Sequence, residues 1–278
     1  MAFHTVDLGA HIGTKILSDI PTLLSGKHAS EIRQLLANRV VLVFPQLGMT
    51  DDEQIAFTKT LGTFKTEDSS NGEIFKISLD PKETDRADSL RASFYWHIDG
   101  TSSDVPLLAS ILSPRCLPAE GGDTQFCNTY AAYEELPKED KALIAGLRVN
   151  HSPAVSARLL NPDMDYEHYR FLRTLAKDLP LVWLHRDGRK SLILGSTTEY
   201  VVGWGPEESR DLLVRLQDWA TQPRFVYQHK WSMGDLVIWD NTGAMHRAVH
   251  YEADSGRLMH RTQLEGEEAF LNHIVEPA

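Results

Sequence analysis

The residues of this chain best suited to chemistry begin with His97 and Asp99, in the segment Phe94 to Gly100. If this segment is extended, side chains two positions apart leave the backbone on the same face, so the imidazole and the carboxylate point into one space. Two such groups are a ready pair of metal ligands. A His-x-Asp pattern is common by chance, however, and a metal site of this kind needs a third ligand.

The best candidate for the third ligand is His246. The segment Gly234 to Arg247 predicts an apolar strand, an Asp-Asn turn and a returning strand that carries this histidine. One carboxylate and two imidazoles form the facial triad that suits non-haem Fe(II), with three positions left for a bidentate cosubstrate and dioxygen. Three other histidines compete for this role, and any of the three is open to an ordinary structural interpretation: His229, His250 and His260.

Two arginines follow the histidine in the sequence. Arg257 and Arg261 are four positions apart, so they share a face if they lie on a strand. A guanidinium can bind a carboxylate through two parallel hydrogen bonds, which is what an acidic substrate or cosubstrate requires. Exposed arginines are also common on strands, so the pair alone leaves both interpretations open.

Short apolar segments separated by turn residues dominate the second half of the chain and predict strands. The expected strands are Val40 to Phe44, Ile74 to Ser78, Leu107 to Leu112, Leu181 to His185, Ser191 to Leu194, Phe225 to Trp231, Leu236 to Trp239 and Leu258 to Leu264. Helices are expected around Ile32 to Leu36, from a capping box at Thr50 to Gly62, and from Pro206 to Trp219. This pattern favours a mainly β fold with flanking helices (α+β), an antiparallel jelly roll, over a doubly wound parallel sheet.

Composition restricts the classes of function. The chain has 278 residues, a net charge of −11 and 42% hydrophobic residues, without a repeat or a linker, so we expect one domain over residues 1–278. A negative balance without a basic block argues against nucleic acid or an anionic membrane as a partner. No apolar run is long enough to span a membrane, and no secretory signal opens the chain, so a cytoplasmic protein is expected. We interpret Cys116 and Cys127 as reduced structural residues.

Four ordered motifs together resemble one known family. They are Trp96-His97-x-Asp99, Gly121-Gly122-Asp123-Thr124, Trp239-Asp240-Asn241-x4-His246-Arg247 and Arg257-x3-Arg261. The chain resembles the taurine and chlorophenoxyacetate dioxygenase family of Fe(II)- and 2-oxoglutarate-dependent oxygenases. Thr124 lies 27 residues after His97, and Arg257 lies 11 after His246, as the family pattern requires. The resemblance implies a double-stranded β-helix, which is a form of jelly roll, with Fe(II) as cofactor and 2-oxoglutarate and dioxygen as cosubstrates.

The resemblance also implies roles for individual residues. His97, Asp99 and His246 would hold Fe(II), while Thr124 and Arg257 would bind the distal carboxylate of 2-oxoglutarate. Two further residues would face the prime substrate: Arg261, the second arginine of the tail, and Ser93, where taurine-type members carry an asparagine. Because the carboxylate ligand is intact, the family pattern favours hydroxylation over halogenation.

Within the family, the segments Gly121 to Pro137 and Phe225 to Asn241 look closer to the chlorophenoxyacetate branch than to the taurine branch. The segment Lys65 to Ile77 lacks the His-x-x-Tyr pair of taurine-type members. Ser103 stands where many members carry an aromatic residue, and we expect it to leave a roomier pocket wall. The segments expected to line the pocket are 65–93 and 152–178, and the second has helix-like and loop-like interpretations of similar merit.

The expected reaction is hydroxylation of an aliphatic C–H bond in a small organic acid. An aryloxyalkanoate is the candidate for this acid, and its ether bond would then cleave. A sulfonate or alkyl sulfate dioxygenase is the alternative with the same chemistry. Alternatives of other classes are a non-catalytic jelly-roll binding protein and a zinc hydrolase that uses the same three ligands. A homo-oligomer is compatible with the sequence.

Overall fold

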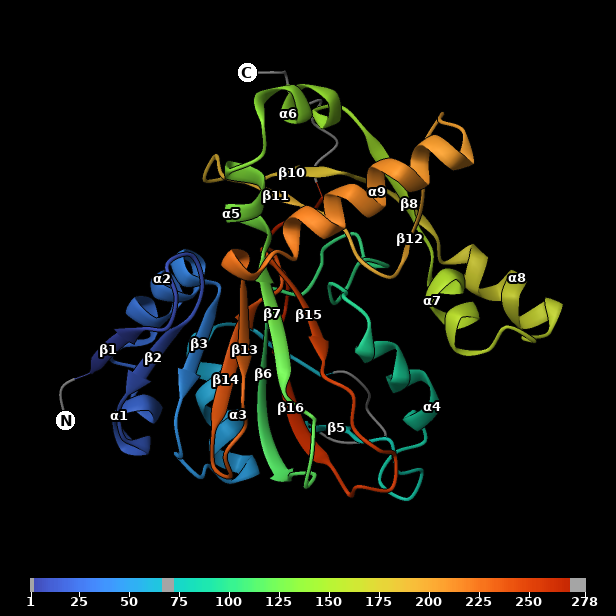
Figure 1. Ribbon diagram of the computed structural model, residues 1–278. Helices are drawn as coiled ribbons and strands as arrows, with labels where there is room; N and C mark the ends of the chain where they lie inside the picture. Colours follow the sequence, from blue (N-terminus) through green and yellow to red (C-terminus); the bar gives the residue numbers. More distant parts are fainter. Residues whose placement is uncertain (1–2, 67–72, 271–278) are drawn as a thin grey trace.

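A computed structural model of the chain describes residues 3–66 and 73–270. In these residues short strands form sheets that face one another, and helices cover the outside of the sheets (Figure 1). The mainly β architecture with flanking helices that the sequence predicts is therefore confirmed. Among the described residues, no helix is both long enough and apolar enough to cross a membrane.

The largest sheet contains the strands β1 (His4–Asp7), β2 (Thr14–Leu17), β3 (Val41–Phe44), β4 (Phe64–Lys65), β5 (Phe75–Ile77), β6 (Ala109–Cys116), β14 (Leu236–Asp240) and β16 (Leu258–Leu264). Their order is β1-β2-β3-β14-β6-β16-β4, and β5 also pairs with β16. Neighbours are antiparallel except for β2 and β3, which run parallel.

A second sheet has the order β13-β7-β15 and contains β7 (Thr124–Asn128), β13 (Val226–His229) and β15 (Ala244–Ala248). A third sheet contains β8 (Arg148–His151), β9 (Lys177–Pro180) and β12 (Thr198–Val201), while β10 (Val182–Leu184) and β11 (Lys190–Leu192) form a two-stranded ribbon. The turn after β14 carries the chain from the largest sheet into β15 of the second sheet, so Asp240 and His246 belong to different sheets.

The helices are α1 (Ile20–Leu24), α2 (Ala29–Arg39), α3 (Asp51–Leu61), α4 (Ala87–Leu90), α5 (Thr129–Glu134), α6 (Lys138–Ile144), α7 (Pro153–Leu160), α8 (Tyr166–Thr174) and α9 (Pro206–Ala220), with 3-10 turns η1 (Arg91–Phe94) and η2 (Pro223–Phe225). The expected capping box is present at the start of α3, where Thr50 accepts from the Glu53 N–H and Glu53 accepts from the Thr50 N–H. The segment 152–178, for which the sequence favoured neither helix nor loop, contains two helices and the start of a strand.

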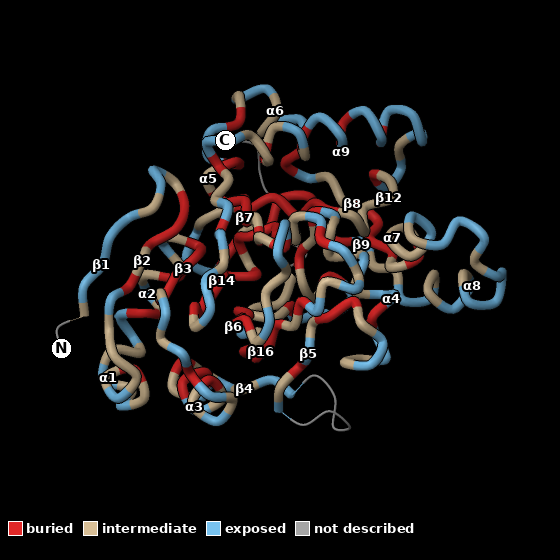
Figure 2. Tube along the Cα trace, turned by 60° about the horizontal axis from the view of Figure 1, so that its bottom comes forward, coloured by how far each residue is buried: buried red, intermediate tan, exposed pale blue. Residues whose placement is uncertain are grey.

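The alternation of side chains along β14 explains why its sequence is a continuous apolar run. Leu236 and Ile238 pack with the helices on the outer face of the largest sheet, whereas Val237 and Trp239 pack between the two facing sheets. Phe126 of β7 meets Trp239 across this gap, with ring centroids 5.5 Å apart. Both faces of the strand are thus buried, as the red segments of Figure 2 illustrate for the central strands.

Besides shifts of one to four residues at other strand ends, the structure differs from the sequence-based expectations at Val40 and at Phe94 to Gly100. The strand expected to begin at Val40 begins one residue later, because Val40 ends α2 in a left-handed conformation with φ of 66°. The segment Phe94 to Gly100, expected to be extended, is not a strand of a sheet. It leaves η1, makes one isolated bridge at His97, and enters a turn at Asp99.

Candidate active site

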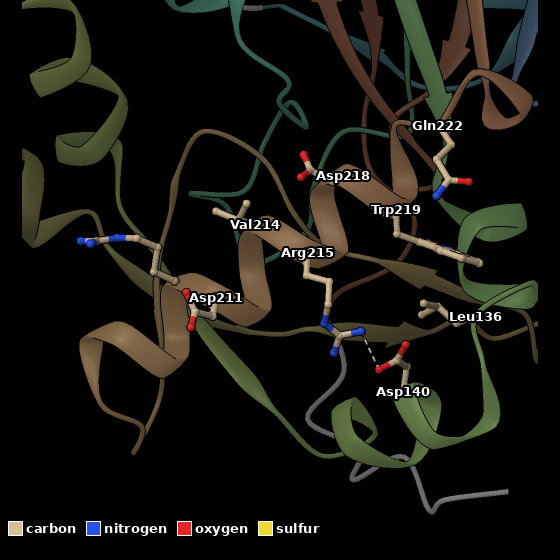
Figure 3. A pocket seen from close by; sticks show the side chains of 9 residues that line it. Leu136, Asp140, Asp211, Val214, Arg215, Asp218, Trp219 and Gln222 are labelled. Carbon is tan, nitrogen blue, oxygen red and sulfur yellow. Dashed lines mark hydrogen bonds and ion pairs between the residues drawn. The ribbon is translucent and has the colours of Figure 1, made fainter.

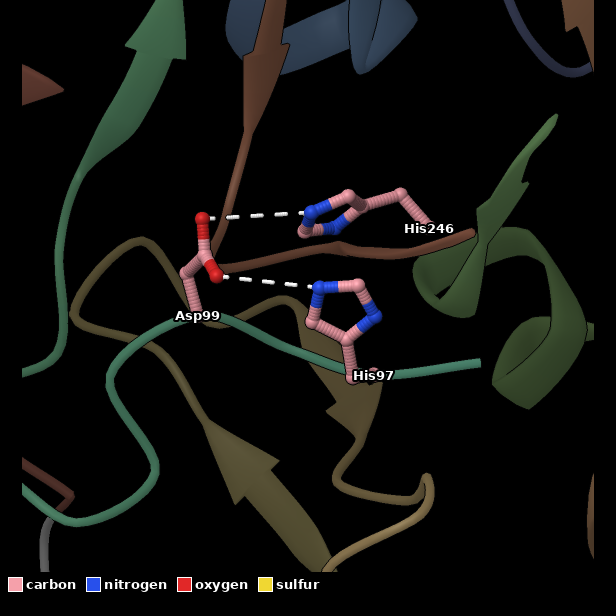
Figure 4. A group of neighbouring side chains, drawn as sticks. All are labelled: His97, Asp99 and His246. Atoms are coloured by element: carbon pink, nitrogen blue, oxygen red, sulfur yellow. Dashed lines mark ion pairs between the residues drawn. The ribbon is translucent and has the colours of Figure 1, made fainter. Parts of the chain in front are cut away.

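His97, Asp99 and His246 converge at one point between the sheets, although they come from distant parts of the sequence. One ligand atom from each residue can be chosen so that all three lie within 4.8 Å of one another. Each imidazole has its Nε2 atom 3.8 Å from a different oxygen of Asp99 (Figure 4). Among the described residues this is the one group of three such side chains close enough to hold a metal ion.

The backbone fixes two of these residues as a pair. His97 forms an isolated antiparallel bridge with His246 on β15, in which each residue donates its N–H to the carbonyl of the other. Residues opposite each other in such a bridge bring their side chains together, and the two imidazole centroids are 4.1 Å apart. A single bridge is sufficient to align both ligands, which explains why the site forms without the extended segment expected from the sequence.

The hydrogen bonding of His97 leaves its Nε2 atom available. Its Nδ1 atom lies 2.8 Å from the carbonyl oxygen of Tyr95, to which an Nδ1–H would donate. Because a neutral imidazole carries one proton, this bond leaves a lone pair on Nε2, the atom that faces Asp99. Metal-binding histidines commonly use a second hydrogen bond of this kind to fix the ring orientation.

Asp99 is held in its charged form. Burial would raise the pKa of this carboxyl, but the Arg261 guanidinium and the two imidazoles outweigh that effect and lower the pKa to about 2. Arg261 donates from Nη1 to Oδ2 at 3.2 Å, and the Ser110 hydroxyl donates to the same oxygen at 3.3 Å. The carboxylate is therefore ionised at neutral pH and directed toward the two histidines.

His246 is neutral for a different reason. Its side chain is buried between Phe126 and Trp239, and this burial, with smaller effects of His97 and Arg261, holds its pKa well below the usual value. A neutral imidazole is the form that binds a metal ion. One ionised carboxylate and two imidazoles therefore make a donor set that fits a divalent transition metal.

The three competing histidines lie in other surroundings. His229 bonds Asp235 through Nε2 at 3.0 Å, and His260 bonds Asp51 through Nδ1 at 2.8 Å. His250 lies beyond the end of β15 and is exposed, with its ring against Phe94. None of the three belongs to the cluster of His97, Asp99 and His246.

Thr124 and Arg257 lie together next to the cluster. Both line the same cavity of about 290 Å³ as His97, Asp99 and His246. Arg257 is only 3% exposed, its guanidinium stacks on Tyr251, and its Nε donates to the Gly122 carbonyl at 3.2 Å. A buried permanent cation is costly unless it meets an anion, so this arginine is suited to bind an acidic group inside the cavity.

Close packing around the backbone of Gly121 and Gly122 leaves no room for a side chain at either position. Both residues have a positive φ, of 72° and 74°. A Cβ on Gly121 would lie 2.0 Å from the His250 carbonyl oxygen, and a Cβ on Gly122 would lie 3.0 Å from Arg257 Nε. The two glycines therefore allow β7 to begin against the arginine, which places Thr124 at the cavity.

Arg261 and Ser93, which the sequence assigned to the prime substrate, also line this cavity. Arg261 extends from β16 to Asp99, and Ser93 lies on η1, which packs against β15. The structure thus brings all seven predicted site residues to one cavity: His97, Asp99, His246, Thr124, Arg257, Arg261 and Ser93.

The expectation that Ser103 forms a wall of this cavity is wrong. Gly100 has a φ of 88°, and the Ser103 N–H donates to the Gly100 carbonyl at 2.9 Å. This turn carries the chain away, so that Ser103 borders a separate hollow with Asp104 and Arg148. Of the expected wall segments, residues 67–72 fall outside the described part of the chain.

A larger hollow lies elsewhere on the molecule, along α9. Its volume is about 760 Å³, and its lining includes Trp219, Asp218 and Gln222 (Figure 3). Arg215 and Asp140 form an ion pair there, with Nη1 and Oδ1 2.7 Å apart. No predicted site residue lines it, so size alone does not locate the chemistry.

Sequence reasoning missed one partner of the predicted site. The indole Nε1 of Trp231 donates to Thr124 Oγ1 at 3.0 Å and so orients the hydroxyl. The register of β13 against β7, in which His229 pairs with Thr124, brings the following indole to this position. The sequence offered no signal for it, because strand register is a property of the folded sheet.

Together the fold and the site define a mainly β protein with a two-histidine, one-carboxylate cluster beside a buried arginine. Comparison with known proteins identifies the family within this class. Residues 4–263 match the family model described as Taurine catabolism dioxygenase TauD, TfdA family. The chain belongs to this family and is an oxidoreductase, a dioxygenase that uses Fe(II) and 2-oxoglutarate.

Individual relatives cover most of the chain. The chain is 34% identical over 260 residues to the "Alpha-ketoglutarate-dependent 2,4-dichlorophenoxyacetate dioxygenase" of Cupriavidus pinatubonensis (strain JMP 134 / LMG 1197), covering 87% of this chain and 90% of that protein. It is 32% identical to the "Alpha-ketoglutarate-dependent sulfate ester dioxygenase" of Pseudomonas putida, covering 84% of this chain and 79% of the relative. Its structure is similar to that of AAD-2 in complex with Mn(II) and N-oxalylglycine, with a TM-score of 0.83, 30% identity and coverage of 97% of this chain and 100% of the other.

Proposed function

We propose that this chain hydroxylates an aliphatic C–H bond of a small organic acid, and that aryloxyalkanoate-like acids are its substrate class. The observation that carries the proposal is the single cavity lined by His97, Asp99, His246, Arg257 and Arg261. The metal-binding cluster shares this cavity with two arginines, so that one acid can be held at each arginine. One of these acids is 2-oxoglutarate. The relative that is named for 2,4-dichlorophenoxyacetate supports an aryloxy acid as the other, the prime substrate.

The proposal assigns Fe(II) to His97, Asp99 and His246. The donor set fits this ion, because it combines a carboxylate with two imidazoles. When bound there, iron supplies the oxidising chemistry by which dioxygen and 2-oxoglutarate yield succinate, carbon dioxide and one oxygen atom for the substrate. The remaining work of the chain is to bind, orient and shield the reactants.

Arg257 and Thr124 bind the distal carboxylate of 2-oxoglutarate in this proposal. The guanidinium provides charge in a buried position, and the hydroxyl, oriented by Trp231, provides a second polar contact. Fixing the far end of the cosubstrate also fixes the distance of its other end from the metal cluster. Such positioning is a large part of what a protein contributes to a reaction of bound groups.

Arg261 and Ser93 bind the acid group of the prime substrate. The carbon placed nearest the cluster is then the carbon attacked. If that carbon carries an ether oxygen, the C–H bond becomes a C–OH bond and the product is a hemiacetal. The hemiacetal releases a phenol or alcohol, which takes up the hydroxyl proton, and leaves an aldehyde or keto acid. Hydroxylation at another carbon gives a stable alcohol.

A sulfonate or alkyl sulfate is the second candidate substrate class, because an arginine binds a sulfate oxyanion as well as a carboxylate. The relative named as a sulfate ester dioxygenase favours it. A non-catalytic binding protein and a zinc hydrolase with the same ligands are the candidates of other classes. Neither explains the second arginine beside the cluster, since they require no acidic cosubstrate.

The same proposal includes the finer architecture. We expect the facing sheets to form a double-stranded β-helix within a single domain over residues 1–278, active in the cytoplasm, and the proposal is compatible with a homo-oligomer. Size-exclusion chromatography with light scattering measures the assembly.

Substrate-dependent release of succinate tests the proposed function. Purified protein with Fe(II), 2-oxoglutarate and air is offered a panel that contains phenoxyacetate, 2-phenoxypropionate, hexyl sulfate and taurine. We expect succinate above the background with an aryloxy acid, together with the phenol. Release with hexyl sulfate alone would favour the second candidate, and release with no member of a broad acid panel would contradict the proposal.

A further inference from the structure

The segment just before His97 in the sequence forms one wall of the cavity. It carries an arginine, Arg86, to which no role has been assigned. Arg86 stands directly before α4, and it lines the same cavity as Ser89 of α4 and Ser93 of η1. The 3-10 turn packs against β15 and α7, so this short wall is anchored to the strand that bears His246. In Figure 1, α4 lies on the side of the molecule next to β5.

One aromatic ring links Arg86 to Arg261. Phe75 of β5 is 5% exposed, and the Arg261 guanidinium carbon lies 4.9 Å from the centroid of its ring. The Arg86 guanidinium carbon lies 5.4 Å from the same centroid. Because both guanidinium groups contact the same ring, Arg86 and Arg261 are neighbours in the cavity wall. Stacking on an aromatic face also restrains the orientation of a guanidinium before any ligand arrives.

The two arginines differ in depth. Arg261 has a side chain that is 14% exposed and donates to Asp99, whereas Arg86 is an exposed residue at the outer part of the cavity. An anion that enters the cavity therefore meets Arg86 before it reaches Arg261. An arginine at the outer part also attracts anions against the net charge of −11 of the whole chain, since distant acids are screened over about 8 Å at physiological salt.

Most of the charged side chains that line the cavity are cations. Among the described residues that line it, three are arginines, namely Arg86, Arg257 and Arg261, and one is an acid, Asp99. A divalent metal ion would add further positive charge, and 2-oxoglutarate would offset it. Three guanidiniums at one cavity give it N–H donors suited to oxyanions.

We infer that Arg86 is a second anion-binding residue for the prime substrate, acting with Arg261 on its carboxylate or sulfate group. The inference rests on the proposed function and specifies its substrate class: acids with the oxyanion at one end and an apolar body. A guanidinium offers a planar fork of N–H donors to such an oxyanion, so two guanidiniums surround it from two sides. Arg86 thus contributes to specificity and leaves the 2-oxoglutarate end of the site untouched.

Three variants test this role: Arg86→Ala, Arg86→Lys and, as a matched control, Arg91→Ala. Arg91 is an exposed arginine on the adjoining turn, near Asp88, and it does not line the cavity. The KM for each accepted acid is measured by succinate release, with phenoxyacetate and hexyl sulfate as the two arms. We expect Arg86→Ala to raise the KM for the bound acid roughly five- to tenfold, the range for loss of a partly exposed charged contact.

The expected pattern has three further features. Arg86→Lys has an intermediate KM, because it keeps the charge but lacks the planar fork. The KM for the cosubstrate is unchanged in all three variants, and Arg91→Ala behaves like the unaltered protein. Added NaCl raises the KM for the acid less in Arg86→Ala than in the unaltered protein, because part of the screened attraction is already lost.

A binding measurement separates failure of this inference from failure of the proposed function. Calorimetry of phenoxyacetate and hexyl sulfate with protein loaded with Mn(II) and N-oxalylglycine requires no turnover. Weaker binding to Arg86→Ala supports the inference, and the arm with the larger loss identifies carboxylate or sulfate as the anion. Equal affinity of Arg86→Ala and the unaltered protein, or no binding of either anion, overturns the inference. Absence of succinate with every acid overturns the proposed function instead.

Discussion

Gly122 lies directly against Arg257: its carbonyl accepts from the guanidinium Nε at 3.2 Å, and a Cβ at this glycine would lie 3.0 Å from the same nitrogen. Because Gly122 has no side chain, the guanidinium of Arg257, 135 positions later in the sequence, can pack directly against its backbone. The short Gly121-Gly122 motif, which looks like an ordinary turn in the sequence, is in this way part of the proposed 2-oxoglutarate site.

The first prediction concerns this contact. Gly122→Ala places a Cβ 2.7 Å from Pro118 and 3.0 Å from Arg257 Nε, so the arginine must shift. We expect the KM for the cosubstrate, 2-oxoglutarate, to rise about ten- to a hundredfold, the range for loss of hydrogen bonds to a charged group. The control is Gly188→Ala, which shares a positive φ but has nothing within 4 Å of the added Cβ. It should cost about 1 to 2 kcal/mol of stability and leave the KM unchanged. Equal effects on 2-oxoglutarate in both variants would show that backbone strain, not the contact, is responsible.

A second prediction concerns the residue that orients the threonine. Trp231→Phe keeps the aromatic body but removes the N–H that donates to Thr124 Oγ1 at 3.0 Å. We expect weaker 2-oxoglutarate binding, about three- to tenfold, because the hydroxyl is no longer fixed. Trp219→Phe is the matched control, since its indole donates at 2.9 Å to a backbone carbonyl, that of Ala132, far from the cavity. Titration of 2-oxoglutarate in both variants measures the difference, and unchanged binding in Trp231→Phe would contradict the role.

A third prediction separates the roles of Arg257, which directly precedes β16, and Arg261, which lies on that strand. Arg257→Lys keeps a charge but loses the fork, and it should chiefly raise the KM for the cosubstrate. Arg261→Ala should chiefly raise the KM for the prime substrate and should increase succinate release that is not matched by product, because the substrate is no longer held in place. Ratios of product to succinate measure this uncoupling. Identical effects of the two variants on both KM values would count against the division of roles.

A fourth prediction concerns stability and pH. Burial would raise the pKa of Asp235, but its hydrogen bonds from His229, Ser232 and Gln46 lower it below the usual value. An acid whose pKa is lowered on folding stabilises the protein above its unfolded pKa, about 3.9, and loses this contribution as the pH falls through the folded pKa. Asp235→Asn should therefore cost about 1 to 3 kcal/mol at pH 7.

Urea unfolding at several pH values measures this contribution. The difference between the unaltered protein and Asp235→Asn should shrink only as the pH falls below the unfolded pKa, about 3.9, toward the lower pKa of the folded carboxyl. A difference that stays constant over this range would show that the charge of Asp235 is not the cause.

Metal binding should persist in His229→Gln, because His229 bonds Asp235 and lies outside the cluster of His97, Asp99 and His246.

Much of the site was predictable from the sequence because its residues occur in short motifs with fixed spacing. His97 and Asp99 are two apart, and the Asp-Asn turn before His246 is readable as a turn between strands. The mainly β fold was predictable for the same reason, since strands such as Leu258–Leu264 are apolar runs with clear ends.

The parts that could not be predicted depend on the direction of the chain after a turn and on register. Ser103 follows Gly100 by three residues, and only the left-handed conformation of that glycine shows that the chain leaves the cavity. Trp231 meets Thr124 because of strand register. Arg86 lies directly before a short helix, and the sequence of this segment has no apolar periodicity to predict its facing.

The central claim is that His97, Asp99 and His246 hold Fe(II) in the presence of 2-oxoglutarate. Its most direct test is an anaerobic titration of the purified protein with Fe(II) and 2-oxoglutarate, followed by visible absorption. We expect a charge-transfer band that requires both additions and that is lost in His97→Ala, while circular dichroism shows that the variant is folded. No band in the unaltered protein, or a band of equal strength in folded His97→Ala, would contradict the account.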